Sequence, residues 1–227
     1  MGIISPFINA GHYSGLMPRT SGPETREKLI RAGEEVFAAQ GAHGAQLRDI
    51  VRLAGQSNPS AVQYHFGSRA GLLDAVMAER QTRTEKVLTA ELARAGDHGL
   101  RGLLRALVAA EATELRTERG RRCLRISTQL SHESGVRTRT PHPTIDGTVY
   151  WDLIGRVESC LTALPEPLRL ERLDLALTLV GAAMADRAGQ YLAGTTPLTD
   201  EALFAADLVE TTTALLQAPR PALGDMP

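Results

Sequence analysis

Between residues 23 and 217 the chain consists of segments rich in Ala, Leu, Arg and Glu, separated by Gly and Pro. These four residue types favour helices, and we find no extended alternation of β-branched and polar residues of the kind that is typical of strands. The sequence therefore predicts an all-α fold of about nine helices. The expected helices cover residues 24–40, 46–53, 59–66, 69–95, 100–118, 121–133, 145–163, 166–193 and 199–217.

Composition limits the class of protein. The chain has 227 residues, 43% of them hydrophobic and 22% charged, which is ordinary for a globular protein with a sizeable core. No run of about 18 apolar residues occurs, so we expect neither a membrane span nor a membrane partner. The first 22 residues lack the basic start and the uninterrupted apolar block of a signal peptide. We therefore expect a cytoplasmic protein with a disordered leader.

Motifs for catalysis or metal binding are missing from the sequence. No Glu lies three residues before any of the six histidines, as a di-iron helical bundle would require. The chain also lacks a Gly-x-Ser-x-Gly elbow, a phosphate-binding Gly loop and a close Cys/His cluster. We therefore expect that the chain is not an enzyme and that it binds neither a cofactor nor a metal ion. Cys123 and Cys160 are interpreted as reduced structural residues rather than as a redox sensor.

The first three expected helices have the layout of a helix-turn-helix unit. The helix over residues 24–40 carries an apolar stripe spaced three and four residues apart, and Gly41 ends it. A short helix over residues 46–53 ends at Gly55, and the turn "QSNP" leads into a second short helix. Two short helices joined by a tight turn, after a longer supporting helix, are typical of proteins that place the last helix in the major groove of DNA.

The segment "QSNPSAVQYHFGSR", residues 56 to 69, combines apolar and polar side chains in one short helix. We expect Val62 and Phe66 to pack inward. Small polar side chains and Gln can contact base edges, whereas Tyr, His and Arg can donate hydrogen bonds to phosphates. Asn58 or Ser57 is expected to cap the helix, and Ser68 to cap the next one. The residues predicted to bind DNA are Arg48, Ser57, Asn58, Ser60, Gln63, Tyr64, His65 and Arg69.

The stretches "TREKLIRAGEEVFAAQGAHGAQLRDIVRLAG" and "SAVQYHFGSRAGLLDAVM" resemble the N-terminal region of tetracycline-repressor (TetR) family regulators. The resemblance covers about residues 25 to 77 and lies in the order and spacing of the Gly, Ala and aromatic-His-Phe positions. It implies base and phosphate contacts by Ser60, Gln63, Tyr64 and His65, a backbone clamp at Arg69 and a contact from Arg48. Two features depart from the family pattern: the turn "GQSNPSA" is one residue longer, and Ala45 replaces a Ser or Thr cap.

The positions of Gly and Pro between the expected helices suggest two domains with flanking segments. We expect a disordered leader over residues 1–22, a helix-turn-helix DNA-binding domain over 23–70, a helical effector-binding and dimerisation domain over 71–217, and a flexible tail over 218–227. The last two helices carry apolar and small residues suited to close helix approach, and the resemblance implies a dimer built from this pair. The expected interface residues are Leu177, Gly181, Met184, Phe204, Leu208, Thr212 and Leu215.

The resemblance also implies a ligand cavity among the middle helices. Apolar residues at helical spacing supply candidates for its wall, and Arg125 and His132 are candidates for its polar contacts. The candidate ligand residues are Leu103, Leu107, Arg125, His132, Tyr150, Trp151 and Ile154.

These observations predict a homodimeric repressor that binds a two-fold symmetric double-stranded DNA operator and is released by an unidentified small apolar molecule. A helical protein-interaction module without DNA binding is the alternative, because the charge is close to neutral. The whole chain has a net charge of −1, and residues 19–86 contain ten basic and eight acidic side chains. A helical enzyme is the weaker alternative.

Overall fold

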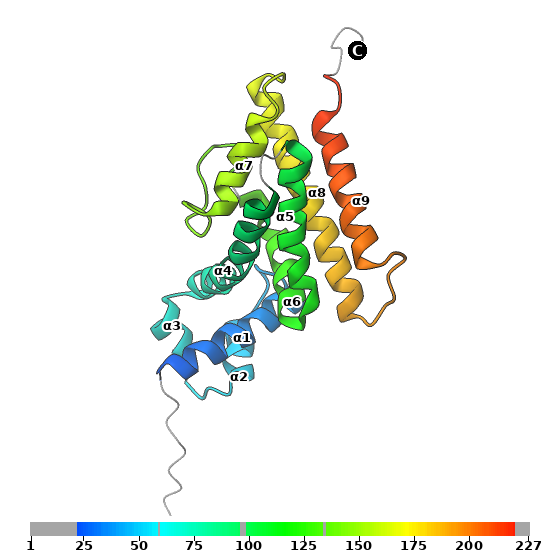
Figure 1. The fold of residues 1–227 in the computed structure, drawn as a ribbon. Coiled ribbons are helices and arrows are strands. Elements are labelled where there is room, and N and C mark those ends of the chain that lie inside the picture. Colours follow the sequence, from blue (N-terminus) through cyan, green and yellow to red (C-terminus); the bar gives the residue numbers. More distant parts are fainter. Residues whose placement is uncertain (1–21, 59, 96–98, 134, 221–227) are drawn as a thin grey trace, which may run out of the picture.

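The structure, a computed structural model, describes residues 22–58, 60–95, 99–133 and 135–220. Within these ranges the chain forms helices and no strand, which confirms the expected all-α fold (Figure 1). The helices are α1 (Gly22–Gln40), α2 (Leu47–Leu53), α3 (Ala61–Phe66), α4 (Arg69–Ala95), α5 (Leu100–Ala112), α6 (Glu118–Ser127), α7 (Val149–Ser159), α8 (Glu166–Leu192) and α9 (Glu201–Gln217), with the 3-10 helices η1 (Thr113–Arg116) and η2 (Thr128–Glu133).

The two ends of the chain are described only in part. Residues 1–21 of the expected leader and 221–227 of the expected tail lie outside the described residues, and Gly22 already belongs to α1. None of the helices in the described ranges combines the length and the hydropathy that crossing a bilayer requires.

The helix expected over residues 100–118 is shorter because the chain changes direction before Gly120. It ends at Ala112 and tightens into η1, after which Thr117 caps α6 by accepting a hydrogen bond from the N–H of Gly120. A Cβ on Gly120 would lie 2.2 Å from the carbonyl oxygen of Glu114, so only Gly permits this close approach. The sequence correctly predicts a break between two helices near Gly120, but the first of them, α5, already ends at Ala112.

The helix expected over residues 145–163 is also shorter, because its cap lies further along the chain. The Thr148 hydroxyl accepts a hydrogen bond from the N–H of Trp151, so α7 begins at Val149. The carboxylate of Glu85 in α4 accepts hydrogen bonds from the N–H groups of Val149 and Tyr150, at 3.0 and 2.9 Å. These contacts satisfy the free N–H groups at the start of α7 and attach it to α4.

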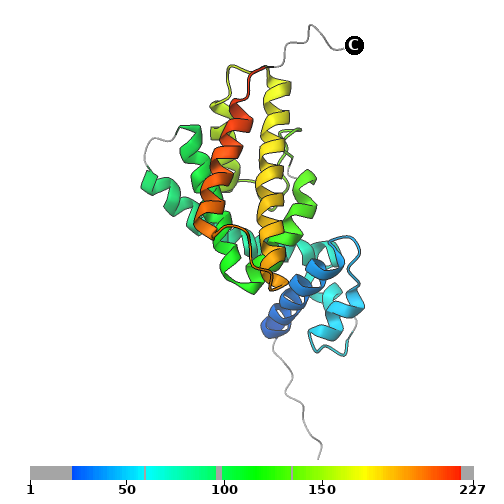
Figure 2. The same ribbon diagram turned by 90° about the vertical axis from the view of Figure 1, so that its right-hand side faces the viewer.

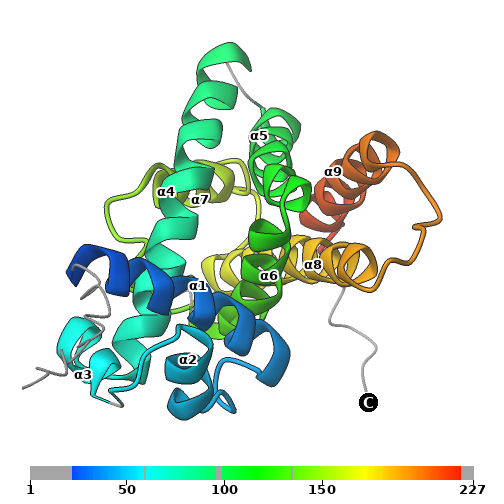
Figure 3. The same cartoon turned by 90° about the horizontal axis from the view of Figure 1, so that it is seen from below.

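The first core holds the three N-terminal helices together. Phe37 of α1, Ile50 of α2, Val62 of α3 and Leu72 of α4 are fully buried in one apolar cluster. The cluster also contains Ile126 of α6, so this unit packs directly on the rest of the molecule. Figure 3 shows α1 crossing α4 and α6, with α2 and α3 on the outer side.

The second core lies among α5, α7, α8 and α9. Figure 2 shows α8 and α9 side by side and antiparallel. Two buried arginines of α8 fix the pair at its ends. Arg187 donates to the carbonyl and hydroxyl oxygens of Thr199 in the α8–α9 turn, at 2.8 and 2.9 Å. Arg172 donates to the carbonyls of Ala218 and Pro219, which satisfies acceptors beyond the end of α9.

Helix α4 belongs to both cores. Leu72 and Val76, near its start, are buried in the N-terminal cluster, whereas Leu88, three turns further on, is buried in the C-terminal cluster. The expected domain boundary between residues 70 and 71 therefore falls at the start of a helix that both units share. The boundary itself stays a prediction.

The two cysteines lie in different environments. Cys123 is fully buried in the N-terminal core, and burial raises the pKa of its thiol to about 11. This thiol is structural, as expected, because a thiol with such a pKa is almost entirely protonated at neutral pH. Cys160, directly after α7, was interpreted as a structural residue, but its side chain is exposed and is not part of either core.

An ion-pair bridge centred on Arg119 of α6 connects α1 and α4. Its Nε donates to Glu34 of α1 at 2.6 Å, and its Nη2 pairs with Glu79 of α4. Glu34 is only 2% exposed, and burial raises the pKa of its carboxyl, against the opposing effect of Arg119. The arginine thus compensates a carboxylate that has little access to water.

Arg119→Met is expected to lower the free energy of unfolding by about 3 kcal/mol at neutral pH, because it leaves the Glu34 carboxylate buried without a partner. Without Arg119 the pKa of Glu34 rises further, so the native state binds this proton more tightly than the unfolded chain does. The loss should therefore be smaller at pH 5 than at pH 8. Urea denaturation at both pH values measures it.

Arg101→Met is the matched control, since Arg101 pairs with Glu210 on the surface, with both side chains more than half exposed. This change should cost less than about 1 kcal/mol at either pH. Equal losses for both variants would contradict the role assigned to Arg119.

Candidate nucleic-acid interface

Helix α3 presents one buried and one exposed face. Ala61 and Val62 are buried against the N-terminal core, whereas Gln63 and Tyr64 point to the surface. Tyr64 is 84% exposed, although a large aromatic side chain usually loses most of its surface on folding. A helix of this kind has its packing side chains on one face and its hydrogen-bonding side chains on the other.

The aromatic residues of α3 form an edge rather than a second core. The rings of Tyr64 and His65 contact each other edge to face, with their centroids 4.9 Å apart. Phe66 is half-buried, and the guanidinium of Arg26 in α1 lies 5.2 Å from its ring centroid. His65 is half-buried between the exposed Tyr64 and the packed Phe66.

The close approach between the end of α3 and the start of α4 depends on glycine. Gly67 has a φ of +72°, and its N–H donates to the carbonyl of Gln63 at 3.0 Å, which ends α3. The hydroxyl of Ser68 caps α4 by accepting a hydrogen bond from the N–H of Gly71, as expected. A Cβ on Gly71 would lie 2.1 Å from the carbonyl oxygen of Phe66, so the two helices can meet at this angle only with Gly here.

The turn between α2 and α3 is ordered by Asn58. Its side-chain oxygen accepts a hydrogen bond from the N–H of Ser60 at 2.9 Å, which closes the turn. The expectation that Asn58 or Ser57 caps α3 is wrong, because Ser60 occupies the cap position and its side chain makes no capping hydrogen bond. Helix α3 begins at Ala61, two residues later than expected, and Pro59 lies outside the described residues. Ser57, Asn58 and Ser60 are all exposed, beside the exposed face of α3.

Helix α2 begins without a side-chain cap, as Ala45 predicts. Gln46 occupies the cap position and makes no capping hydrogen bond with its side chain. The N–H of Gln46 instead donates to the side chain of Gln40, which also donates to Asp49. Asp49 in the first turn adds a favourable charge at the positive end of α2.

Two arginines of α2 are exposed on one face. The side chain of Arg48, a predicted DNA contact, is 80% exposed, and that of Arg52 is 81% exposed. Both lie near the Asp49 carboxylate, at 3.9 and 3.1 Å. Arg52 was not predicted from the sequence, although its spacing of four residues from Arg48 on a helix places the two on the same face.

Arg69 contacts the protein itself. Its guanidinium donates to the carbonyl oxygen of Ala42, in the segment between α1 and α2, and the side chain is half-buried. Ala42 is fully buried, so this hydrogen bond satisfies a carbonyl that water does not reach. Arg69, which was expected to clamp the DNA backbone, thus ties the start of α4 to the supporting helices.

A short helix with an exposed polar face, held on two supporting helices and followed by a larger helical body, defines the helix-turn-helix class of DNA-binding proteins. The model of the bacterial regulatory proteins of the TetR family matches residues 29–76. Residues 29–76 are thus similar to the N-terminal region of bacterial regulatory proteins of the TetR family.

Two curated relatives come from Pseudomonas putida. The HTH-type transcriptional regulator SrpR and the uncharacterized HTH-type transcriptional regulator TtgW are each 44% identical to this chain over 69 residues. The matches cover 30% of this chain and 32% and 51% of the two relatives. The chain thus spans about half or less of the relatives that it matches.

Two solved structures share the fold of nearly the whole chain. A TetR-like transcriptional regulator from Rhodococcus sp. RHA1 has a TM-score of 0.56 with 17% identity, and it covers 86% of this chain and 97% of its own. A second Rhodococcus sp. protein assigned to the TetR family has a TM-score of 0.54 with 16% identity, covering 86% and 100%. These similarities concern the fold alone.

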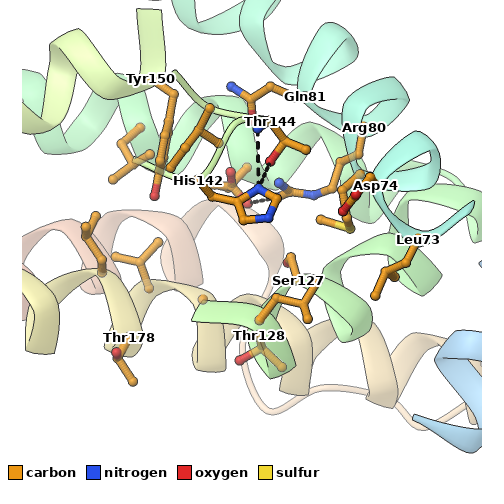
Figure 4. A pocket seen from close by; sticks show the side chains of 18 of the residues that line it. Leu73, Asp74, Arg80, Gln81, Ser127, Thr128, His142, Thr144, Tyr150 and Thr178 are labelled. Atoms are coloured by element: carbon orange, nitrogen blue, oxygen red, sulfur yellow. Dashed lines mark hydrogen bonds and ion pairs between the residues drawn. The ribbon is translucent and has the colours of Figure 1, made fainter. Parts of the chain in front are cut away.

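A cavity of about 170 Å³ lies between α4 and α8 (Figure 4). Of the predicted ligand residues, Leu107 and Tyr150 line it. Leu103 is buried in the core beside it, whereas Trp151 and Ile154 line other hollows around α7. Arg125 is exposed on α6, outside the cavity wall, and the side chain of His132 lies outside the described residues.

The charged part of the cavity wall was not predicted from the sequence. Arg80 of α4 pairs with Glu111 of α5, and both side chains are largely buried. Burial alone would lower the pKa of Arg80, but the Glu111 carboxylate raises it, so the guanidinium stays charged. Burial also raises the pKa of Tyr150 well above its usual range, so its hydroxyl keeps its proton. The only signal in the sequence is the pair of carboxylates at residues 111 and 114, which could equally lie on the surface.

Several residues predicted for the dimer interface pack within the chain. Met184, Leu208 and Thr212 are buried in the C-terminal core, and Leu177 and Gly181 line the cavity. Phe204 and Leu215 are half-buried on α9, with the guanidinium of Arg187 4.1 Å from the Phe204 ring centroid. The exposed face of α8 carries other residues, namely Leu175, Thr178 and Ala182.

Arg69→Ala is expected to lower the free energy of unfolding by about 1–2 kcal/mol, because it leaves the buried Ala42 carbonyl without a donor. Tyr64→Ala should change it by no more than about 0.5 kcal/mol, since the ring is exposed. Urea denaturation of both variants at one protein concentration tests this. A larger loss for Tyr64→Ala than for Arg69→Ala would contradict the arrangement described above.

Proposed function

We propose that the chain is a homodimeric transcriptional regulator, acting as a repressor, that binds a two-fold symmetric double-stranded DNA operator and is released by a small, largely apolar effector. The observation that carries this proposal is the exposed polar face of α3, on which the Tyr64 side chain is largely exposed while Val62 on the opposite face is buried. An exposed aromatic side chain beside Gln63 and Ser60 serves no packing purpose, but it suits contacts with base edges and phosphates.

The proposed contacts fall into two groups. Ser60 and Gln63 face base edges in the major groove, where Gln can pair with adenine. Tyr64, His65 and the two exposed arginines of α2 contact phosphates around the groove, and Ser57 and Asn58 approach the same backbone from the turn. We assign Arg69 to the internal hydrogen bond with Ala42, so any phosphate contact that it makes is secondary.

The proposed dimer forms through the outward faces of α8 and α9. Leu175 is 52% exposed and Leu203 is 56% exposed, so each leaves a large apolar side chain on the surface of one chain. Thr178 and Ala182 follow Leu175 at helical spacing and would let a second α8 approach closely. A two-fold axis through this face would place two copies of α3 on two half-sites of the DNA.

Effector control is proposed to act through α4. Leu72 and Val76 on one side of this helix pack in the core that holds α3, whereas Leu73, Met77 and Arg80 on the adjacent side line the cavity. A ligand that fits the cavity in only one position of α4 therefore shifts the population of that position. The spacing of the two α3 helices in the dimer changes with it.

The alternative is a helical interaction module that does not bind DNA, and the near-neutral N-terminal charge favours it. The salt dependence of DNA binding separates the two. Neutralising phosphates releases counterions, so the affinity of a DNA-binding protein falls steeply with salt, by about 10³-fold or more between 50 and 200 mM when six or more phosphates are contacted.

The first test is selection from a random duplex pool by the purified chain at about 50 mM and about 200 mM salt. We expect enrichment of a two-fold symmetric site whose binding weakens strongly at the higher salt. The same selection with a Tyr64→Ala/Arg48→Ala variant controls for binding that does not involve this face. Absence of both enrichment and salt dependence would reject the DNA-binding proposal and favour the interaction module.

Gln63→Ala and Tyr64→Ala should affect operator binding in different ways. Gln63→Ala is expected to lose about 1–3 kcal/mol of discrimination at one or two base pairs per half-site. Tyr64→Ala should weaken binding to all duplexes by a similar factor, because a phosphate contact carries no sequence information. Competition binding against operators with single base-pair changes measures both. If both variants keep the affinity of the wild type, α3 docks through another face.

A further inference from the structure

The cavity wall contains a buried hydrogen-bond donor without a partner. Arg80 is 7% exposed, and its Nη2 bonds to the carboxylate of Glu111. Its Nε–H is buried and has no hydrogen-bond partner among the residues that the structure describes. A buried donor left unsatisfied is unfavourable, so a site that contains one favours a ligand that supplies an acceptor.

The Arg80 side chain extends from α4 into the cavity, toward the side where the other polar groups gather. Figure 4 shows Gln81, Thr144 and His142 on this side, with Leu73 at one end. The polar groups of the segment before α7 already bond to each other, since Nδ1 of His142 lies 2.9 Å from the Thr144 hydroxyl. Arg80 Nε is thus a buried donor of a wall residue without a partner among the described residues.

The charges around the cavity exclude an anion. The Arg80 charge is compensated by Glu111, and Asp174 pairs with Arg137 at 2.8 Å. Asp74 adds a further negative charge to the lining. A carboxylate ligand would therefore compete with Glu111 for Arg80 and face Asp74 without compensation. A cationic ligand would be placed against the guanidinium and would leave Nε–H unmatched.

The size and the remaining wall limit the ligand further. The volume of about 170 Å³ is close to the roughly 150 Å³ of an apolar cavity that holds benzene. The apolar part of the wall consists of Leu73, Met77, Leu107, Leu130, Ile145, Leu177 and Val180. A molecule of about one ring with a small substituent fills this space.

We propose that the cavity binds an uncharged molecule of about one ring, largely apolar, that places a hydrogen-bond-accepting oxygen on Nε of Arg80. This inference rests on the proposed function in one respect, namely that the cavity is the effector site. Arg80 belongs to α4, the helix whose start packs in the N-terminal core. The contact that selects the ligand is therefore made by the same helix that holds α3 in place.

The test uses three matched single-ring probes and the full chain. Acetophenone carries a neutral acceptor oxygen, ethylbenzene has the same shape without the acceptor, and benzoate carries a negative charge. Isothermal titration of the wild-type protein without DNA is expected to show acetophenone binding roughly tenfold or more tighter than ethylbenzene, as one hydrogen bond to a charged donor implies. Benzoate is expected to bind weakest.

The decisive variant is Arg80→Met/Glu111→Leu, which removes both partners of the pair and so leaves no buried charge alone. It should bind acetophenone and ethylbenzene about equally. Arg83→Met/Glu114→Leu is the control, because Arg83 and Glu114 form the same kind of ion pair one turn further along α4, outside the cavity wall. This control should keep the preference for acetophenone. Thermal melting confirms that both variants fold.

Three results would overturn the inference. Ethylbenzene binding as tightly as acetophenone to the wild type would show that no acceptor is selected, and tighter binding of benzoate would show that the site prefers an anion. A preference that survives in the Arg80→Met/Glu111→Leu variant would place the oxygen elsewhere. Binding of none of the probes would reject the effector site as well. Failure of the duplex selection with the ligand preference intact would reject only the DNA-binding half of the proposed function.

Discussion

The relative position of α1, α4 and α6 depends on the two ion pairs of the Arg119 guanidinium. This guanidinium lies between carboxylates of α1 and α4, one of them almost fully buried, and it belongs to a third helix, α6. A buried carboxylate is unfavourable without a compensating cation, so the three helices are stable only in positions that keep these groups together. The unit that carries α3 is therefore attached to the helical body by a specific geometry as well as by apolar packing.

Helix α4 connects the exposed face of α3 with the cavity. At its start, Gly71 lets it meet the end of α3, and Arg69 ties it to the segment after α1. One turn beyond Val76, Arg80 forms part of the cavity wall. The exposed face of α3, which we propose binds DNA, and the cavity are thus both positioned by α4, and no separate linker is needed to connect them.

The N-terminal unit follows closely from local sequence. Gly41, Gly55 and Gly67 each adopt positive φ where the sequence predicts that a helix or turn ends, and Ser68 caps α4 as expected. The outward face of α3 was also predictable, because Val62 had to be buried and Tyr64 then had to lie on the other side. The middle helices were less predictable, since the start of α7 depends on Glu85, which lies 64 residues earlier.

The sequence by itself determined the all-α class, the helix-turn-helix unit and the polar face of α3, because these follow from helical periodicity, glycine and capping within a few residues of each other. Only the tertiary structure decided that Arg69 bonds to the protein, that Met184 and Thr212 face the interior, and that Arg80 and Glu111 meet in a cavity wall. Periodicity identifies an apolar face of a helix, but the neighbours of that face come from distant parts of the chain. A charged residue likewise looks like a surface residue in the sequence until folding brings its partner to it.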